Sequence, residues 1–277
     1  MTKLSLGFSP CPNDTFIFDA MIHGKIDTEG LEFEVHLADV EELNQKALNN
    51  ELNITKLSYH AYAHLNQHYQ LLQSGSALGH NCGPLLIAKG PMTAAQINSA
   101  KIAIPGQLTT ANFLLSLAYP QATNKSQWLF STIEQAVLDG EVDAGLIIHE
   151  SRFTYEAKGL VKLIDLGEYW EQQTAMPIPL GGIAIQRQIA NEIQQKVDRV
   201  LQRSVRFAWD HPDSSSDCVS QHAQEMEESV MQQHIALYVN EYTDALGEKG
   251  RKAIDLMYKK ADDLEIIPKM DKKLFVG

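Results

Sequence analysis

The sequence predicts an α/β protein built from two lobes. Predicted strands and helices alternate along most of the chain, a pattern typical of sheets with parallel strands. Composition shifts at Gly90-Pro91 and Gly181-Gly182 enclose a βα segment of about a hundred residues, an ordinary size for one domain. Beyond Gln188 the pattern becomes helical, because apolar residues recur at four-residue spacing from Ile189 to Val205.

These shifts predict an inserted domain. We expect residues 1–89 and 186–277 to form a first, discontinuous lobe with a helical carboxyl-terminal part. Residues 90–185 would form the second α/β lobe. Because the chain would then cross twice between lobes, the two crossings predict a hinge and an interlobe cleft that can close on a ligand.

The composition indicates which kinds of binding partner are not expected. The 277 residues are 44% hydrophobic and 21% charged, as in ordinary soluble proteins. Lys and Arg number 23 against 35 Asp and Glu, a net charge of −12, so nucleic acid is not an expected partner. No stretch approaches the roughly 20 apolar residues of a spanning helix, so no membrane partner is expected either.

The amino-terminal stretch and the cysteines predict a cytoplasmic protein. The first residues lack the apolar stretch of a secretory signal. Cys11, Cys82 and Cys218 are odd in number and widely spaced, which argues against a disulfide framework and fits a reducing compartment.

His149 is the first catalytic candidate. It follows residues 144–148, a short apolar run typical of a strand buried on both faces. Ligands of open α/β sheets bind at the carboxyl ends of the strands, and an imidazole there can act as a general base near neutral pH. The alternative is a histidine that only ends a strand. Glu150 is not favoured, because neighbouring strand residues point opposite ways.

Hydroxyl-bearing residues follow two other strands. Ser58 ends the strand predicted at residues 54–57, and Thr109 and Thr110 precede a helix predicted at 111–119. Hydroxyls and backbone N–H groups at such places suit a carboxylate or polyol ligand, although plain helix capping explains the threonines equally well. Lys56 could face a carboxylate or extend to solvent.

The loop at residues 9–15 joins the first strand to a helix predicted at 16–23. We expect Asn13 or Asp14 to cap that helix, whose amino end would suit an anion. Cys11 could be a nucleophile, but a small buried side chain is its commoner role.

No cofactor or metal is expected. His60, His64 and His68 would share one helix face, but no carboxylate or second cluster is spaced to complete a metal site. The Gly-x-Gly-x-x-Gly and Walker patterns are absent, which disfavours NAD and ATP.

Four segments together resemble one known family. They are SPCPNDTF at 9–16, KLS at 56–58, TTA at 109–111 and GLIIHE at 145–150. The chain is similar here to the 1,4-dihydroxy-6-naphthoate synthases of the futalosine route to menaquinone. The resemblance implies a two-lobed, periplasmic-binding-protein-like (type II) fold used as an enzyme.

The resemblance also implies a reaction and roles for named residues. Cyclic dehypoxanthinyl futalosine would be converted to 1,4-dihydroxy-6-naphthoate with release of dihydroxyacetone. His149 would accept the proton, and the substrate contacts would be Lys56, Leu57, Ser58, Thr109 and Thr110. The expected partner is therefore a small molecule with carboxylate and polyol groups, and no cofactor is required.

Other functions remain open at this point. A chorismate dehydratase-like sister enzyme would share the fold and use a smaller, doubly acidic substrate. A non-catalytic solute-binding protein would need no histidine placed as a base, and a ligand-sensing regulator would need a DNA-binding segment that is not evident. The sequence leaves the oligomeric state open between monomer and homodimer.

Overall fold

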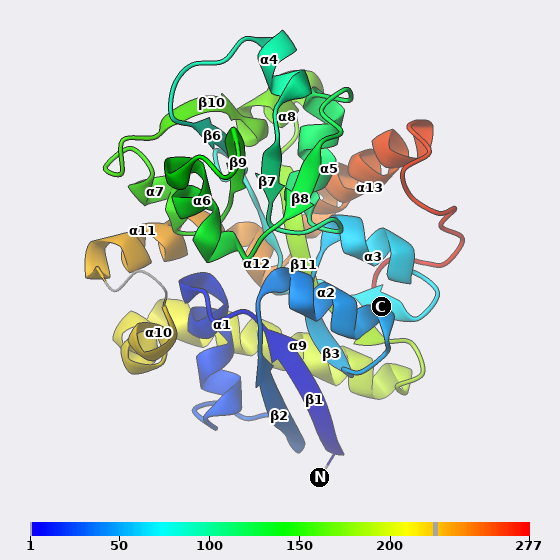
Figure 1. Ribbon diagram of the computed structural model, residues 1–277. Coiled ribbons are helices and arrows are strands. Elements are labelled where there is room, and N and C mark those ends of the chain that lie inside the picture. Colours follow the sequence, from blue (N-terminus) through cyan, green and yellow to red (C-terminus); the bar gives the residue numbers. More distant parts are fainter. Residues whose placement is uncertain (1, 224–226) are drawn as a thin grey trace. The chain divides into compact units, whose positions relative to one another are not determined.

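The chain divides into two compact units. The computed structural model describes residues 2–223 and 227–277 (Figure 1). Unit 1 contains the residues as far as Gly79 together with Pro179–Gly277, and unit 2 is His80–Ile178. The boundaries expected at residues 90 and 186 are therefore displaced. The reason is strand pairing: β6 (Leu85–Ala88) joins the sheet of unit 2, whereas β11 (Ile178–Gln186) joins that of unit 1.

The sheet of unit 1 has the strand order β2-β1-β3-β11-β4, and β5 pairs with β11. Its other strands are β1 (Thr2–Phe8), β2 (Leu31–Leu37), β3 (Ile54–Ser58), β4 (Tyr69–Leu71) and β5 (Ala77–Gly79). Strand β1 pairs in parallel with β2 and β3, as the strand-helix alternation predicts. Strand β11, which returns from unit 2, is antiparallel to β3 and β4.

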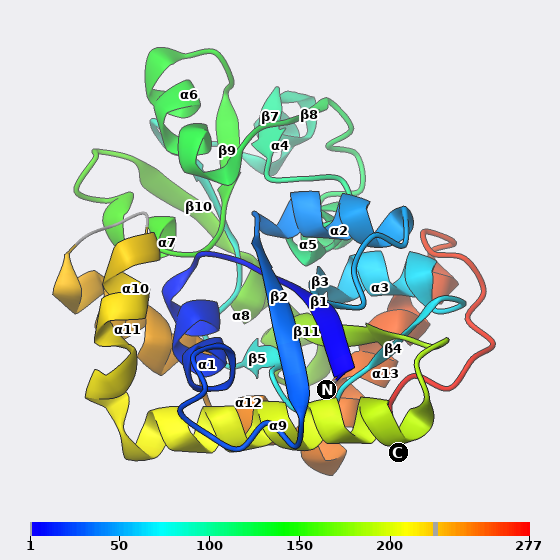
Figure 2. The ribbon, with the colours of Figure 1, turned by 90° about the horizontal axis from the view of Figure 1, so that it is seen from below.

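Helices cover both faces of this sheet. Figure 2 shows α9 along one face, and α2 and α3 on the other. The helices of unit 1 are α1 (Pro12–Ile22), α2 (Val40–Leu48), α3 (Tyr59–Leu65), α9 (Asn191–Asp210), α10 (Ser216–His222), α11 (Glu228–Tyr238), α12 (Glu241–Asp244) and α13 (Gly247–Asp263), with a 3-10 turn η2 (Pro212–Ser215).

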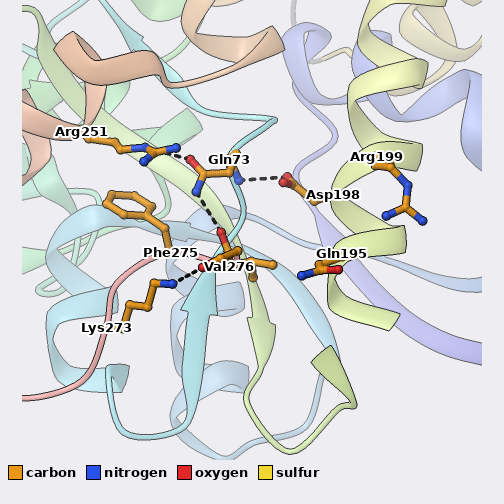
Figure 3. A pocket seen from close by; sticks show the side chains of 9 residues that line it. Gln73, Gln195, Asp198, Arg199, Arg251, Lys273, Phe275 and Val276 are labelled. Carbon is orange, nitrogen blue, oxygen red and sulfur yellow. Dashed lines mark hydrogen bonds between the residues drawn. The ribbon is translucent and has the colours of Figure 1, made fainter. Parts of the chain in front are cut away.

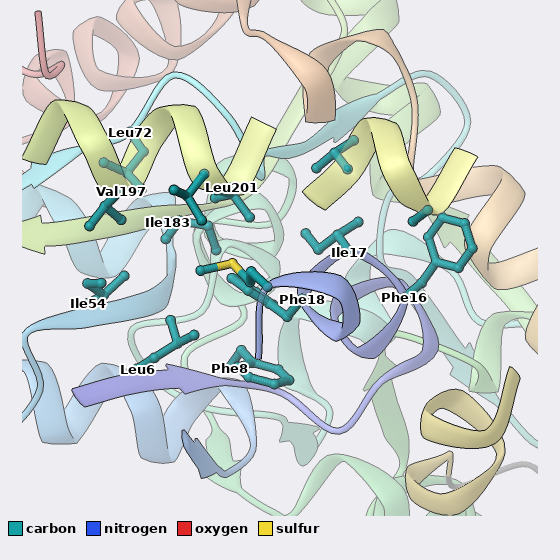
Figure 4. Packing of buried hydrophobic residues seen from close by; sticks show 14 of the residues in the cluster. Leu6, Phe8, Phe16, Ile17, Phe18, Ile54, Leu72, Ile183, Val197 and Leu201 are labelled. Carbon is teal, nitrogen blue, oxygen red and sulfur yellow. The ribbon is translucent and has the colours of Figure 1, made fainter. Parts of the chain in front are cut away.

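The core of unit 1 lies between the sheet, α1 and α9. Leu6 and Ile183 of the sheet meet Phe18 of α1 and Leu201 of α9, and all four side chains are buried (Figure 4). The stripe predicted from residue 189 onward is therefore the buried face of α9. Burial of such side chains contributes roughly 1.5–3 kcal/mol each, so this layer holds α1 against the sheet.

The carboxyl-terminal segment docks on β4, which the sequence pattern did not indicate. Phe275 forms a β-bridge with Leu71, and Val276 donates its backbone N–H to the Leu71 carbonyl at 2.9 Å. Gln73 ties this segment to α9, since its Nε2 donates to the Val276 carbonyl and its backbone N–H donates to Asp198 (Figure 3). The last residues thus belong to the packed structure of unit 1.

The sheet of unit 2 has the order β10-β6-β9-β7-β8. Its other strands are β7 (Ile102–Ile104), β8 (Lys125–Gln127), β9 (Ala144–Ile147) and β10 (Val161–Asp165). Strands β7, β8 and β9 are parallel, whereas β6, which follows the first crossing, is antiparallel to both β9 and β10. The sheets are therefore mixed, and the antiparallel strands β6 and β11 are those beside the crossings.

Helices and a buried cluster complete unit 2. The helices are α4 (Ala94–Ser99), α5 (Thr110–Ala118), α6 (Ile133–Asp139), α7 (Ser151–Thr154) and α8 (Leu166–Thr174), with a 3-10 turn η1 (Phe130–Thr132). Ile87, Ala103 and Ile147 of the sheet pack with Ile133 and Val137 of α6. This packing fixes the strand that precedes His149.

Local sequence signals explain some of the helix starts. Asp39 caps α2 and accepts hydrogen bonds from the backbone of Glu41 and Glu42, the usual role of aspartate at an N-cap. The expected start of α1 was wrong, because the helix begins at Pro12, with Cys11 as its N-cap. Proline is favoured at the first helical position, since its fixed φ suits the helix and it has no N–H to satisfy.

Among the described residues, no helix is both long enough and apolar enough to cross a membrane.

Two glycines of unit 2 make a close backbone contact. A Cβ placed on Gly83 would lie 2.2 Å from the backbone nitrogen of Gly167, and one on Gly167 would lie 2.8 Å from that of Gly83. Backbone atoms cannot move aside as a flexible side chain can. Gly83 and Gly167 therefore let the segment before β6 approach the start of α8.

We expect Gly83→Ala to destabilise unit 2 by about 1–3 kcal/mol or more, because the added methyl group overpacks this contact. The measurement is urea unfolding followed by tryptophan fluorescence, to which Trp170 of the same unit contributes. Gly90→Ala is the matched control, since no atom lies within 4 Å of the place that its Cβ would take. Equal unfolding midpoints for the two variants would contradict the packing account.

Candidate active site

The pairing of β7 with β9 determines where the candidate site residues of unit 2 lie. These strands are parallel neighbours, with Ile102 opposite Ala144 and Ala103 opposite Gly145. Their carboxyl ends therefore leave the same edge of the sheet. The chain after β9 reaches His149, and the chain after β7 reaches Thr109 and Thr110 at the start of α5. The sequence prediction that His149 follows a strand buried on both faces is confirmed.

His149 has an unusual backbone conformation. Its φ is +57°, in the left-handed region that side-chain-bearing residues seldom adopt. Such a conformation costs roughly 1–3 kcal/mol and persists only where the surroundings impose it. Here the chain must turn from β9 into α7 within a few residues. The half-buried imidazole lies edge-on to Phe130, with ring centroids 5.1 Å apart and an interplanar angle of 70°.

An ion pair anchors the helix that follows His149. Arg152 of α7 pairs with Asp165 at 2.7 Å and also donates to the Gly83 carbonyl. The other carboxylate oxygen of Asp165 accepts the backbone N–H groups of Gly167 and Glu168 at the start of α8. Asp165 is buried and both of its oxygens accept hydrogen bonds, so it anchors α7, which follows His149, through Arg152.

The two threonines occupy different positions at the start of α5. Thr109 is the N-cap of α5: its Oγ1 accepts from the Asn112 N–H at 3.2 Å and donates to the Gly106 carbonyl at 2.8 Å. Thr109 thus caps α5, and its contact with a ligand stays a prediction. Thr110 is the first residue of α5 and is buried. Its position at the amino end of a nine-residue helix gives a favourable field for an anion.

Lys56, Leu57 and Ser58 belong to β3 of unit 1. The side chain of Leu57 is fully buried, so this residue offers its backbone rather than its side chain to a ligand. Ser58 ends the strand and is held by Asn44 of α2. The Ser58 N–H donates to Asn44 Oδ1 at 3.1 Å, and Asn44 Nδ2 donates to Ser58 Oγ at 3.3 Å. Both bonds fix the hydroxyl at the carboxyl end of β3.

Lys56 contacts a carboxylate within the protein. Its Nζ lies 2.7 Å from Asp14 Oδ1, and the side chains of Lys56 and Asp14 are 8% and 1% exposed. The other oxygen of Asp14 accepts from the Ser9 hydroxyl at 2.7 Å and from the Ser9 N–H at 3.2 Å. The loop between β1 and α1 is thereby attached to β3, and the charge of Lys56 is balanced internally.

A series of hydrogen bonds also connects Asp14 to α11. Asn13 Nδ2 donates to Asp14 Oδ1 at 2.9 Å, so Asn13 Oδ1 is left to accept from His234 Nε2 at 2.8 Å. This arrangement assigns the proton of that bond to Nε2 of His234. His234 is fully buried, so α11 is tied to the first turn of α1 by a defined hydrogen bond.

The structure thus brings the predicted residues together in two sets. His149, Thr109 and Thr110 share one sheet edge of unit 2, and Lys56, Leu57 and Ser58 lie in β3 of unit 1. That the two sets face each other across a cleft stays a prediction.

Sequence reasoning missed the residues that hold these two sets in place, namely Asn44, Arg152, Asp165, Phe130 and His234. Asn44 alone had a local signal, because it is a polar residue beside the apolar Leu43 and Ala47 on the buried face of α2.

We expect Lys56→Met to destabilise the protein by about 3–5 kcal/mol, because it leaves the carboxylate of Asp14 buried without its cation. Urea unfolding measures the loss. The double variant Asp14→Asn/Lys56→Met should recover part of it, since no charge then remains buried. Lys3→Met is the control, because Lys3 pairs with Glu34 at the exposed surface. A loss for Lys56→Met no larger than for Lys3→Met would contradict the assignment.

Comparisons with known proteins agree with this architecture. A family model described as menaquinone biosynthesis matches residues 4–263. A Thermus thermophilus protein named 1,4-dihydroxy-6-naphthoate synthase is 44% identical over 276 residues, covering 100% of both chains. A Streptomyces coelicolor protein of the same name is 40% identical over 270 residues, covering 96% of this chain and 95% of the relative.

Solved structures show the same fold. A crystal structure of a protein from Archaeoglobus fulgidus has a TM-score of 0.91 at 37% identity, covering 96% of this chain and 98% of the other. The alkanesulfonate-binding protein SsuA from Xanthomonas axonopodis pv. citri has a TM-score of 0.72 at 13% identity, covering 100% and 96%. This second likeness concerns the fold alone, and it makes the fold periplasmic-binding-protein-like. From the match over nearly its whole length, the chain belongs to the menaquinone biosynthesis family, as an enzyme of the kind that its two curated relatives represent.

Proposed function

We propose that this enzyme converts cyclic dehypoxanthinyl futalosine to 1,4-dihydroxy-6-naphthoate and releases dihydroxyacetone, with His149 as the general base. The names of the two curated relatives support the product. The observation that carries the role of His149 is its left-handed turn at the carboxyl end of β9, because strained backbone at a strand end is typical of functional sites.

The chemistry of this reaction fits the residues present. Cleavage of a carbon–carbon bond beside a carbonyl, followed by aromatisation, requires a group that takes a proton and donors for an enolate-like oxygen. His149 takes the proton, and its edge contact with Phe130 limits the orientations open to the ring. The Arg152–Asp165 pair keeps the following helix in place while the imidazole changes charge.

The substrate groups can be assigned by charge. We place the carboxylate at the amino end of α5, beside Thr110, because the helix field there favours an anion. We place the polyol at Ser58, whose hydroxyl is oriented by Asn44. Lys56 is paired with Asp14 and therefore acts as part of a neutral pair rather than as a free cation.

The proposal includes a cytoplasmic location, which the three free cysteine thiols support, since such thiols persist in a reducing compartment. It also includes a small-molecule partner and no nucleic acid or membrane partner.

We expect His149→Asn to lower kcat by about 10²–10⁴-fold with a smaller change in KM, because it removes the base while keeping a polar side chain of similar reach. The assay follows formation of the naphthoate from the cyclic futalosine derivative. His68→Asn is the control, since His68 is exposed and lies outside both residue sets. Turnover close to that of the wild type in a folded His149→Asn protein would rule out the base.

We expect Thr110→Val to lower kcat/KM by about ten-fold, the equivalent of one hydrogen bond to a charged group. Thr110→Ser should retain most of the activity, because it keeps the hydroxyl. Thr109→Val should chiefly lower the unfolding midpoint, since the Thr109 hydroxyl caps α5. An unchanged kcat/KM in the Thr110→Val variant would show that the carboxylate binds elsewhere.

A further inference from the structure

Two packed helices of unit 1 carry metal-ligating side chains at one-turn spacing. Asp19 and His23 stand four residues apart at the carboxyl end of α1, and Cys218 and His222 stand four apart on α10. The two helices lie side by side in Figures 1 and 2 and are in direct contact. Residues four apart lie on the same helix face, so each helix can present a pair to its neighbour.

Three of these side chains converge. A carboxylate oxygen of Asp19, a ring nitrogen of His23 and the Sγ of Cys218 all lie within 4.8 Å of one another. His23 Nδ1 is 2.8 Å from Asp19 Oδ1. The cluster borders a cavity of about 210 Å³ that His23, Cys218 and His222 line together, with apolar walls from Phe8 and Leu37. His222 thus lies on the wall of the same cavity as His23 and Cys218, whereas Asp19 does not line it.

We propose that Asp19, His23 and Cys218 form a binding site for a borderline-soft divalent cation such as Zn²⁺. Carboxylate, imidazole and thiolate are ligands that Zn²⁺ takes, and three protein ligands leave the fourth tetrahedral position to water. The site ties α1 to α10 and is separate from the residues assigned to the reaction. It does not rest on the proposed function, and its role is to stabilise unit 1.

Neighbouring charges set the strength of this site. The groups next to the Cys218 thiol are Asp19, which accepts a hydrogen bond from it, Lys25 beyond α1, and His23 of the same cluster. Lys25 Nζ binds the second carboxylate oxygen of Asp19 at 2.5 Å and the Ser214 carbonyl at 2.5 Å. Asp19 can thus offer one oxygen to the metal while the other stays on Lys25, although the ammonium repels a second cation.

The test is a Co²⁺ titration of the full-length protein after treatment with a chelator, followed by Zn²⁺ competition. We expect one equivalent of Co²⁺ to produce a thiolate-to-cobalt charge-transfer band that Zn²⁺ abolishes. Cys218→Ser should eliminate the band, and His23→Gln should weaken binding by more than the roughly 10–100-fold caused by loss of an outer-shell partner. Lys25→Met should strengthen binding, because it removes the repelling charge.

Matched controls separate this site from others. Cys82→Ser and His36→Gln should keep the band, since Cys82 belongs to unit 2 and His36 pairs with Glu34 on β2. His23 is half exposed, so His23→Gln gives a folded test even if Cys218→Ser does not fold. No thiolate band in the wild type, a band that survives Cys218→Ser, or equal affinities for His23→Gln and His36→Gln would each overturn the proposal.

Discussion

The parallel pairing of β7 with β9 is the constraint on which the candidate site depends. It brings the ends of two strands to one sheet edge, so that the left-handed turn at His149 and the amino end of α5 leave the sheet together. Gly145 permits this packing, because a Cβ there would lie 2.5 Å from Ile133 of α6. A shift of the β7–β9 register would separate His149 from the amino end of α5.

Unit 1 uses an equivalent arrangement with a different stabilising interaction. Strands β1 and β3 are parallel, and the Lys56–Asp14 pair joins β3 to the loop that follows β1. A buried ion pair contributes little net stability, because desolvation offsets the attraction, but it strongly disfavours arrangements that separate the charges. The pair therefore fixes where the loop lies more than it adds to the free energy of folding.

The sequence predicted those parts of the fold that depend on nearby residues. Alternation and apolar runs located most strands, and the threonines before residue 111 located the start of α5 to within one residue. The unit boundaries were wrong because they depend on which sheet β6 and β11 join, and both strands are apolar runs that fit either sheet. The docking of Phe275 on Leu71 was also missed, because the two residues are distant in sequence and no local pattern links them.

The candidate site likewise contains some features that the sequence predicts and others that it does not. The placement of His149, Ser58 and Thr110 at strand or helix ends follows from local pattern. The partners that orient them come from distant segments: Asp165 is reached through Arg152, and Asn44 lies on another helix. No spacing rule in the sequence links such residues. The Asp19–Cys218 cluster is a further example, because its two helices are far apart in the chain and meet only after folding.

The most direct measurement is a crystal structure of the His149→Asn variant with intact cyclic dehypoxanthinyl futalosine bound. The proposed function predicts the substrate carboxylate at the amino end of α5, the polyol at Ser58, and the side chain at position 149 within hydrogen-bonding reach of the carbon that loses its proton. Substrate bound with that carbon turned away from position 149, or bound away from the ends of β9 and β3, would contradict it.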